Sequence, residues 1–221
     1  MYFLPIILLA LIQGITEFLP VSSSAHLILA SDFIDFSDKN IAIDVSLHLG
    51  TLLAVTIYFR SDILLIFRDA FKSNSEGQNI AIKILIATFP ILILGGLAFI
   101  SGLVDIFRNI QLIALSTIIF GILLYFADTK IVSQTRTLKK LTNKDSLIIG
   151  IFQVLSIIPG TSRSGIVYTG SRFLSISRME ALRFTMLLSI PTNVALLRVA
   201  ERVMVSAPAP IRTEAPEKTA F

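Results

Sequence analysis

Long apolar runs separated by short polar stretches dominate this chain. The runs lie at about 3–30, 41–59, 80–104, 110–127, 146–158, 164–175 and 180–200. Several approach the roughly 20 apolar residues that a helix needs to cross the hydrocarbon core of a bilayer. Because backbone polar groups in lipid must be paired internally, we predict that all of these segments are α-helical. The pattern indicates an all-α, polytopic integral membrane protein.

Two of the predicted membrane segments are interrupted by polar residues. Gly14, Pro20 and the serines at 22–24 interrupt the first, and Pro159-Gly160 separates the fifth from the sixth. Irregular backbone is tolerated at membrane depth only where it lines a cavity inside the protein. We therefore predict two re-entrant or broken helices that face such a cavity.

The two interruptions resemble each other. The corresponding pairs are Gln13 and Gln153, Pro20 and Pro159, Ser22 and Thr161, and Ser23 and Ser162. The spacing from Gln to Pro differs by one residue, so chance recurrence is an alternative. The location of both copies at the strongly polar interruptions favours duplication, and predicts two inverted repeats whose broken helices meet near the bilayer midplane.

Composition and charge support a membrane protein. Of the 221 residues, 54% are hydrophobic and 15% charged, whereas a soluble domain carries about 25% charged residues. The absence of cysteine excludes disulfides and thiolate metal sites. The net charge of +4 does not indicate nucleic acid, because the cations cluster in short loops near 60–83 and 128–145. By the positive-inside rule, we predict that both loops are cytoplasmic.

The chain divides into two parts of different composition. Residues 1–200 contain all of the apolar runs and are predicted to form a single transmembrane domain. Residues 201–221 are rich in proline and polar residues, which cannot build a packed core. We expect this tail to be disordered.

Ionisable groups at membrane depth indicate a functional site. Arg163 has a planar fork of donors suited to phosphate oxygens. The hydroxyls of Ser162 and Ser164 and the amides of the turn at Gly160 could complete an anion-binding nest. The alternative is an arginine that snorkels to the interface. Snorkelling does not explain the flanking serines or the Pro-Gly break, so we favour phosphate binding.

The first interruption supplies complementary chemistry. Glu17 could ligate a hard divalent cation, and Gln13, one helical turn earlier, could add a carbonyl ligand. Ser22, Ser23 and Ser24 with His26 offer a nucleophile and a base, or a nucleophilic histidine supported by hydroxyls. The alternatives are a protonated, hydrogen-bonded Glu17 and a His26 that only packs.

A further polar pair, Asp44 and His48, lies at i, i+4 spacing in the second apolar run, so the two residues are expected to meet across one turn. Interhelical hydrogen bonding is the favoured role, with proton relay as the alternative.

With these residues in hand, the chain resembles the undecaprenyl-diphosphate phosphatase family, also called bacitracin-resistance proteins. The first motif is QGITEFLPVSSSAH at 13–26, and the second is PGTSRSG at 159–165. The similarity extends through HLGT at 48–51 and FTMLLSIP at 184–191, and covers about residues 1–195.

The resemblance implies an enzyme of the bacterial inner membrane with interlocked inverted repeats. It would remove the terminal phosphate from the C55 polyprenyl diphosphate carrier of cell-wall synthesis, assisted by a divalent cation (Mg²⁺ or Ca²⁺), at a site open to the external side. Its partners would be this lipid and the membrane, with a homodimer as a further option. The implied roles are catalytic for Glu17, Ser23, His26 and Arg163, substrate-binding for Gly160, Ser22, Ser162, Arg163 and Ser164, and metal-binding for Glu17 and Gln13.

Two features depart from the family pattern. Val167 occupies the place of a motif threonine, and Thr169 would point elsewhere on a helix. Family members usually continue with further membrane helices, whereas this chain becomes hydrophilic after about residue 200, as in a shortened or altered member. If the chain is an enzyme, the shortened C-terminus predicts impaired activity as an alternative to full activity. A non-catalytic membrane protein is a further hypothesis.

The main competing function is a transporter or flippase for an anionic lipid or solute. Broken helices, inverted repeats and midplane charges are equally typical of transporters.

Overall fold

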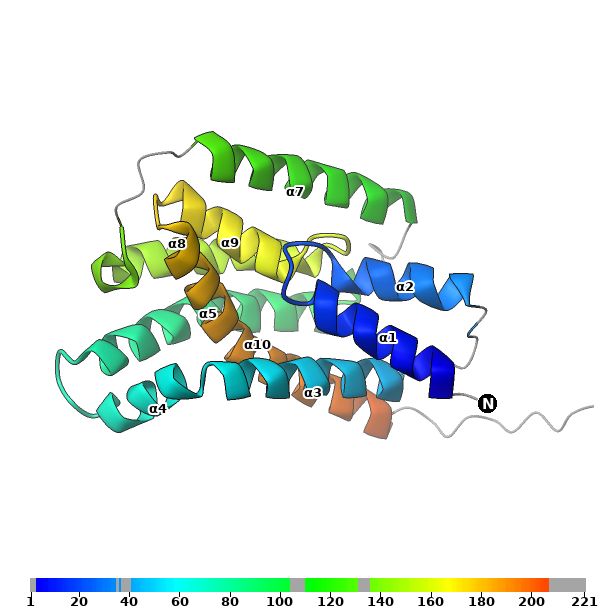
Figure 1. Ribbon diagram of the computed structural model, residues 1–221, viewed down its shortest axis with the longest axis horizontal. Coiled ribbons are helices and arrows are strands. Elements are labelled where there is room, and N and C mark those ends of the chain that lie inside the picture. The colour runs from blue at the N-terminus through cyan, green and yellow to red at the C-terminus, as the bar shows by residue number, and fades with distance from the viewer. Residues whose placement is uncertain (1–2, 35, 37–40, 104–109, 131–135, 207–221) are drawn as a thin grey trace, which may run out of the picture.

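The computed structural model describes residues 3–34, 36, 41–103, 110–130 and 136–206, and within these ranges the chain is helical apart from short turns (Figure 1). The α-helices are α1 (Phe3–Thr16), α2 (Ser23–Phe33), α3 (Ile41–Tyr58), α4 (Arg60–Asp69), α5 (Glu76–Ile100), α7 (Ile110–Lys130), α8 (Asn143–Val154), α9 (Arg163–Phe173) and α10 (Arg178–Ser206). Two 3₁₀ turns lie at Leu138–Lys140 and Leu155–Ile157. The predicted all-α class is confirmed.

Among the described residues, two helices are long and apolar enough to cross a membrane, namely α5 and α7. A third span is made by α3 and α4 if this bent pair is counted as one, with an angle of 71° at the break. The sequence predicted a loop directly after residue 59. Instead Arg60 begins α4, whose charged first turn carries Asp62, an ion-pair partner of Arg183 in α10. The cytoplasmic placement of the basic loops stays a prediction.

Both predicted interruptions are present and are built alike. Ser22 caps α2 by accepting a hydrogen bond from Ala25 N (3.4 Å), and Ser162 caps α9 by accepting one from Gly165 N (3.1 Å). Serine is a favoured N-cap because its hydroxyl accepts a hydrogen bond from an otherwise unpaired amide of the first turn. The same local device at both breaks supports the duplication. It makes Ser22 equivalent to Ser162, so the predicted pairing of Ser22 with Thr161 and of Ser23 with Ser162 is wrong by one residue.

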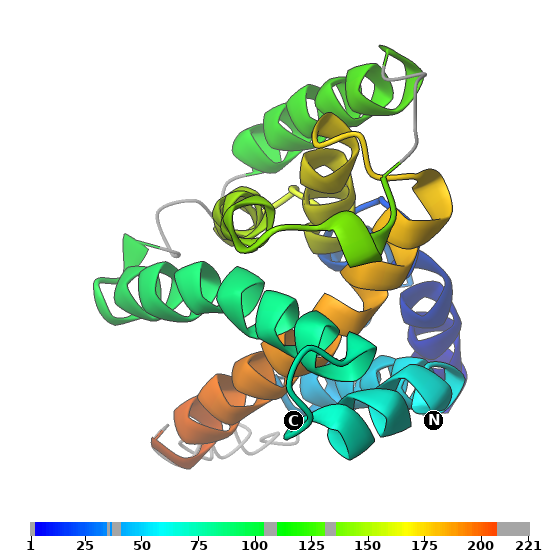
Figure 2. The same cartoon turned by 90° about the vertical axis from the view of Figure 1, so that its left-hand side faces the viewer.

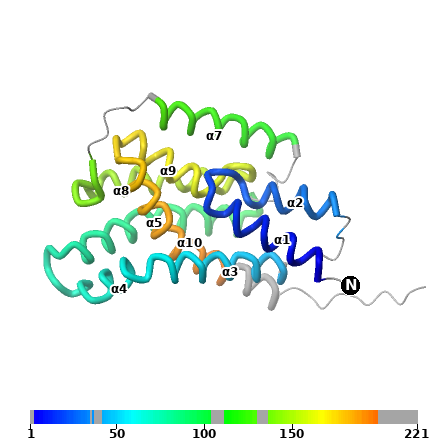
Figure 3. The backbone as a smooth tube through the Cα atoms, viewed as in Figure 1, coloured from blue at the N-terminus to red at the C-terminus, as the bar shows by residue number. Residues whose placement is uncertain are grey.

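The two broken segments form antiparallel hairpins that enter from opposite ends of the molecule. The chain reverses between α1 and α2, and again between α8 and α9, as the tube drawing shows (Figure 3). The turns of the two hairpins lie beside each other near the middle of the structure.

The larger core lies where α5, α8, α9 and α10 meet, with Phe184 and Ile149 among its fully buried side chains. Helix α5 packs closely on α8 because Gly150 has no side chain. A Cβ there would lie 2.6 Å from the carbonyl oxygen of Ala87. Helix α10 crosses the molecule diagonally and packs against α3, α5 and α9 (Figure 2). It continues to Ser206, past the boundary predicted at residue 200, and 207–221 lie outside the described residues.

A charged network joins α7 to the second hairpin at the end of the molecule away from the turns. The Asp128 carboxylate accepts hydrogen bonds from Arg172 Nε (3.0 Å), Arg178 Nε (3.0 Å) and the Tyr168 hydroxyl (2.8 Å). Arg172 is completely buried. A buried guanidinium needs a carboxylate or several carbonyl partners to offset its lost hydration, so Asp128 fixes the end of α7.

Replacing Asp128 with alanine is expected to lower the free energy of unfolding by about 3 kcal/mol, because the buried Arg172 guanidinium loses its carboxylate. Arg178→Ala is the matched control. Its side chain is 58% exposed, so its ion pair is screened by water and contributes little to stability. Unfolding in mixed detergent micelles would measure both. Equal losses of unfolding free energy in the two variants would show that the buried Arg172 does not account for the effect of Asp128→Ala.

Candidate active site

The two hairpin turns contact each other directly. Ser164 Oγ donates a hydrogen bond to the carbonyl oxygen of Leu19 (3.0 Å). Gly165 permits this approach, because a Cβ there would already lie 3.2 Å from Pro20 O. The breaks in the two halves of the chain therefore form one site.

Helix α7 holds the second turn in place. Ser116 Oγ donates to Pro159 O (2.6 Å), and Thr117 Oγ1 donates to Gly160 O (3.1 Å). Gly160 has φ +90°, which favours glycine, and any Cβ would collide with Ser116. Gly160 is therefore required by the backbone of the turn. It does not line the polar cavity described next.

A polar cavity of about 200 Å³ lies between the two turns. Its lining comes from both breaks and from α3 and α10. The lining residues are Glu17, Val21, Ser22, Ser23, Ser24, His48, Ser156, Thr161, Ser162, Arg163, Ser164 and Leu196. The structure thus brings together most of the predicted site residues, and leaves Gln13, His26 and Gly160 out of this lining.

Glu17 and Ser23 form the closest polar pair in the cavity. Ser23 Oγ donates to Glu17 Oε2 at 2.7 Å, and Gln13 Nε2 donates to the same oxygen at 3.1 Å. The Glu17 side chain is only 12% exposed. A carboxylate that accepts the proton of a hydroxyl is the arrangement of a general base with its nucleophile.

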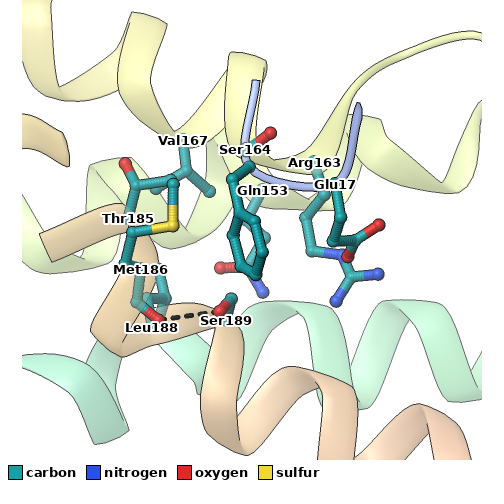
Figure 4. Close-up of a pocket in the computed structure, with 10 residues that line it drawn as sticks. Glu17, Gln153, Arg163, Ser164, Val167, Thr185, Met186, Leu188 and Ser189 are labelled. Atoms are coloured by element: carbon teal, nitrogen blue, oxygen red, sulfur yellow. Dashed lines mark hydrogen bonds between the residues drawn. The ribbon is translucent and has the colours of Figure 1, made fainter. Parts of the chain in front are cut away.

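Arg163 lies beside this pair and supplies positive charge. Figure 4 shows the Glu17 and Arg163 side chains next to each other below the first turn, and the two attract electrostatically. Arg163 Nη1 also donates to Asn193 Oδ1 on α10. The remaining N–H groups of the guanidinium are available to an anion in the cavity.

The structure places His48, and not His26, against this carboxylate. His48 Nε2 is 4.0 Å from Glu17 Oε2, while its Nδ1 is 2.9 Å from the carbonyl oxygen of Asp44. The expected contact of Asp44 and His48 across one turn is present, and the His48 ring makes it with the Asp44 backbone. His26 is exposed, and its Nδ1 lies 2.7 Å from Ser22 O. The sequence favours a structural role for His48, although an ionisable residue within an apolar run also indicates a functional site.

The departure at Val167 does not fall in the polar cavity. Val167 is buried and lines a small adjoining pocket with Gln153 and Met186 (Figure 4). Thr169 donates to Gly165 O (2.7 Å) within its own helix and does not replace a motif hydroxyl in the cavity.

The donor set fits a divalent cation only in part. Among the described residues, no three carboxylates or imidazoles are grouped as a metal site. Glu17 is the one carboxylate lining the cavity, and Gln13 Oε1 is a buried acceptor without a hydrogen-bond partner in the described part of the chain. Mg²⁺ typically takes one or two carboxylates and completes its shell with phosphate oxygens and water. These residues could hold a cation together with a phosphate ligand.

An apolar cavity of about 330 Å³ adjoins the polar one. The two share Ser156, Arg163 and Leu196. The other lining residues are Ile91, Leu92, Gly95, Gly96, Phe99, Ile157, Thr192 and Ala195. A ligand that bridges both cavities needs an anionic head and an apolar body.

Fold and site together define a helical membrane protein with a polar, arginine-lined cavity that is built from two broken hairpins and joined to an apolar cavity. Comparison with known families identifies which one. The chain matches the model of the bacitracin resistance protein BacA family over residues 6–217, and it belongs to that family.

Relatives agree with this assignment. The chain is 47% identical over 196 residues to the undecaprenyl-diphosphatase of Hahella chejuensis, with 86% of this chain and 73% of that protein covered. It is 45% identical to undecaprenyl-diphosphatase 1 of Pseudoalteromonas translucida, with the same two shares covered. The undecaprenyl-diphosphatase of Saccharophagus degradans is 46% identical, with 84% of this chain and 71% of that protein covered.

Proposed function

We propose that this chain removes the terminal phosphate from undecaprenyl diphosphate and so regenerates the monophosphate carrier lipid in the bacterial inner membrane. The observation that carries the proposal is the junction of the two cavities at Arg163. A diphosphate head fits the polar side, where Glu17 and Ser23 lie, and an isoprenoid chain fits the apolar side. Relatives named undecaprenyl-diphosphatase support the same substrate. No relative named here is a transporter, so the transporter hypothesis gains no support.

The geometry supports a covalent mechanism with Ser23 as the nucleophile. Ser23 Oγ attacks the terminal phosphorus while its proton passes to Glu17 Oε2, with which it is already hydrogen-bonded. The bond from that phosphorus to the bridging oxygen breaks, and undecaprenyl phosphate leaves. Water then attacks the phosphoserine, the Ser23 O–P bond breaks, and Glu17 returns its proton to Ser23 as phosphate leaves. Arg163 stabilises the negative charge of the transferring group in both steps.

The choice of Ser23 over His26 rests on placement. Ser23 lines the polar cavity and bonds to the carboxylate, whereas the exposed His26 does neither.

A divalent cation, Mg²⁺ or Ca²⁺, is part of the proposal. Glu17 would hold it, with the unsatisfied amide oxygen of Gln13 as a second candidate ligand. When bound, such a cation would neutralise phosphate charge.

A bulky side chain in the apolar cavity tests the proposal. Gly96→Phe is expected to raise KM for undecaprenyl diphosphate by about tenfold, because a phenyl ring fills space that the isoprenoid chain needs. A Cβ at Gly96 meets nothing within 4 Å, so the fold can accept the substitution. Phosphate release from the purified protein is the measurement. Farnesyl diphosphate, which has a shorter chain, should be affected less.

Gly121→Phe on α7 is the matched control, since a Cβ there also meets nothing within 4 Å and Gly121 lies outside both cavities. Its kinetics should equal those of the wild type. A wild-type protein that releases no phosphate from undecaprenyl diphosphate would refute the proposed function. A Gly96→Phe variant with unchanged KM would refute only the proposed place of the isoprenoid chain in the apolar cavity.

A further inference from the structure

Asn193 makes a contact that the sequence motifs do not suggest. Its side chain is only 2% exposed, and its Oδ1 accepts a hydrogen bond from Arg163 Nη1. It lies on α10, two residues after Pro191, 30 residues beyond the arginine it contacts.

The neighbouring residue holds the other helix of the same hairpin. Gln153 Nε2, on α8, donates to Thr192 Oγ1 at 2.9 Å. One turn of α10 therefore fixes both α8 and α9 where the second hairpin approaches the cavity.

The chemistry of the contact is informative, because the acceptor is neutral. A guanidinium has several N–H donors in a fixed plane, so one bond to Asn193 sets the orientation of the whole fork. An amide oxygen achieves this without adding a second carboxylate to Glu17 beside the positive charge. A carboxylate at the same place would orient Arg163 equally well, but it would compete with a phosphate for that charge.

We propose that Asn193 is a positioning residue for the diphosphate: it aims the Arg163 guanidinium at the polar cavity without adding a second carboxylate to Glu17 beside it. The proposal rests on the proposed function for the identity of the anion. It predicts that a negative charge at position 193 weakens anion binding without lowering stability.

Asn193→Asp is the decisive variant because it keeps the shape of the side chain. It should bind inorganic pyrophosphate about tenfold more weakly and raise KM for undecaprenyl diphosphate by a similar factor, since an ion pair now occupies part of the guanidinium. Its thermal melting temperature should be equal to or above that of the wild type, because Arg163 gains a charged partner. If Asn193 only packed against its neighbours, Asn193→Asp would change pyrophosphate affinity and melting temperature together.

Two further variants complete the test. Asn193→Leu removes the acceptor without adding charge, and should lower kcat as well as raise KM because the guanidinium is no longer oriented. Asn143→Asp adds the same charge at an exposed position in the first turn of α8, and should leave binding and turnover unchanged.

Pyrophosphate binding, measured by calorimetry, separates this inference from the proposed function. A wild-type protein that releases no phosphate overturns the function, while the comparison of pyrophosphate affinities still tests the role of Asn193. Equal affinity in the wild type and Asn193→Asp, or equal losses in Asn193→Asp and Asn143→Asp, would overturn the positioning role.

Discussion

Glu17→Gln is expected to reduce phosphate release by about 100-fold or more, the usual effect of removing a general base. Glutamine has nearly the same shape and can still accept a hydrogen bond from Ser23, whose Oγ lies 2.7 Å from Glu17 Oε2. It cannot accept the proton, so the hydroxyl stays a weak nucleophile. The loss should fall on kcat, and initial rates with undecaprenyl diphosphate measure it.

Glu76→Gln is the matched control for this substitution. Glu76 lies at the start of α5 in an ion pair with Lys139 (3.0 Å), and its side chain is 39% exposed. Turnover by this variant should stay within about twofold of the wild type, because exposed ion pairs contribute little. If Glu17→Gln kept more than half of the activity while its melting temperature was unchanged, the carboxylate would not be the base.

Most of the fold could be predicted because the signals for it are local. Apolar runs specify membrane helices, and Pro20 and Pro159-Gly160 mark the breaks that the structure contains. The bend between α3 and α4 could not be predicted, since Phe59 carries no helix-breaking signal. The charges at the start of α4 suggested a loop, but Asp62 is paired with Arg183, 121 residues away. A contact over that separation has no signature in either segment alone.

The same division applies to the candidate site. Glu17, Ser23 and Arg163 could be recognised because polar groups at membrane depth are costly and therefore informative. That the two breaks meet could also be predicted, from the repeat of the polar interruptions, and the contact of the two turns and their common cavity confirm it. The place of His48 beside Glu17 depends on how α3 is rotated, and the contact of Asn193 depends on how α10 crosses α9. Sequence proximity groups His26 with the serines, yet its ring contacts Ser22 O and does not line the polar cavity.

Arg163→Lys should reduce kcat/KM by about tenfold or more, and Arg163→Ala by about 100-fold or more. Lysine keeps the charge but replaces a planar fork with a single point donor, so it cannot both bond to Asn193 and grip two phosphate oxygens. The difference between the two variants therefore separates charge from geometry. Arg178→Lys is the matched control for replacing an arginine by lysine, because Arg178 is exposed and does not line the polar cavity. Its kcat/KM should equal that of the wild type. If Arg163→Ala turned over substrate as fast as the wild type, the diphosphate would have to bind elsewhere, because Arg163 is the one cation that lines both described cavities.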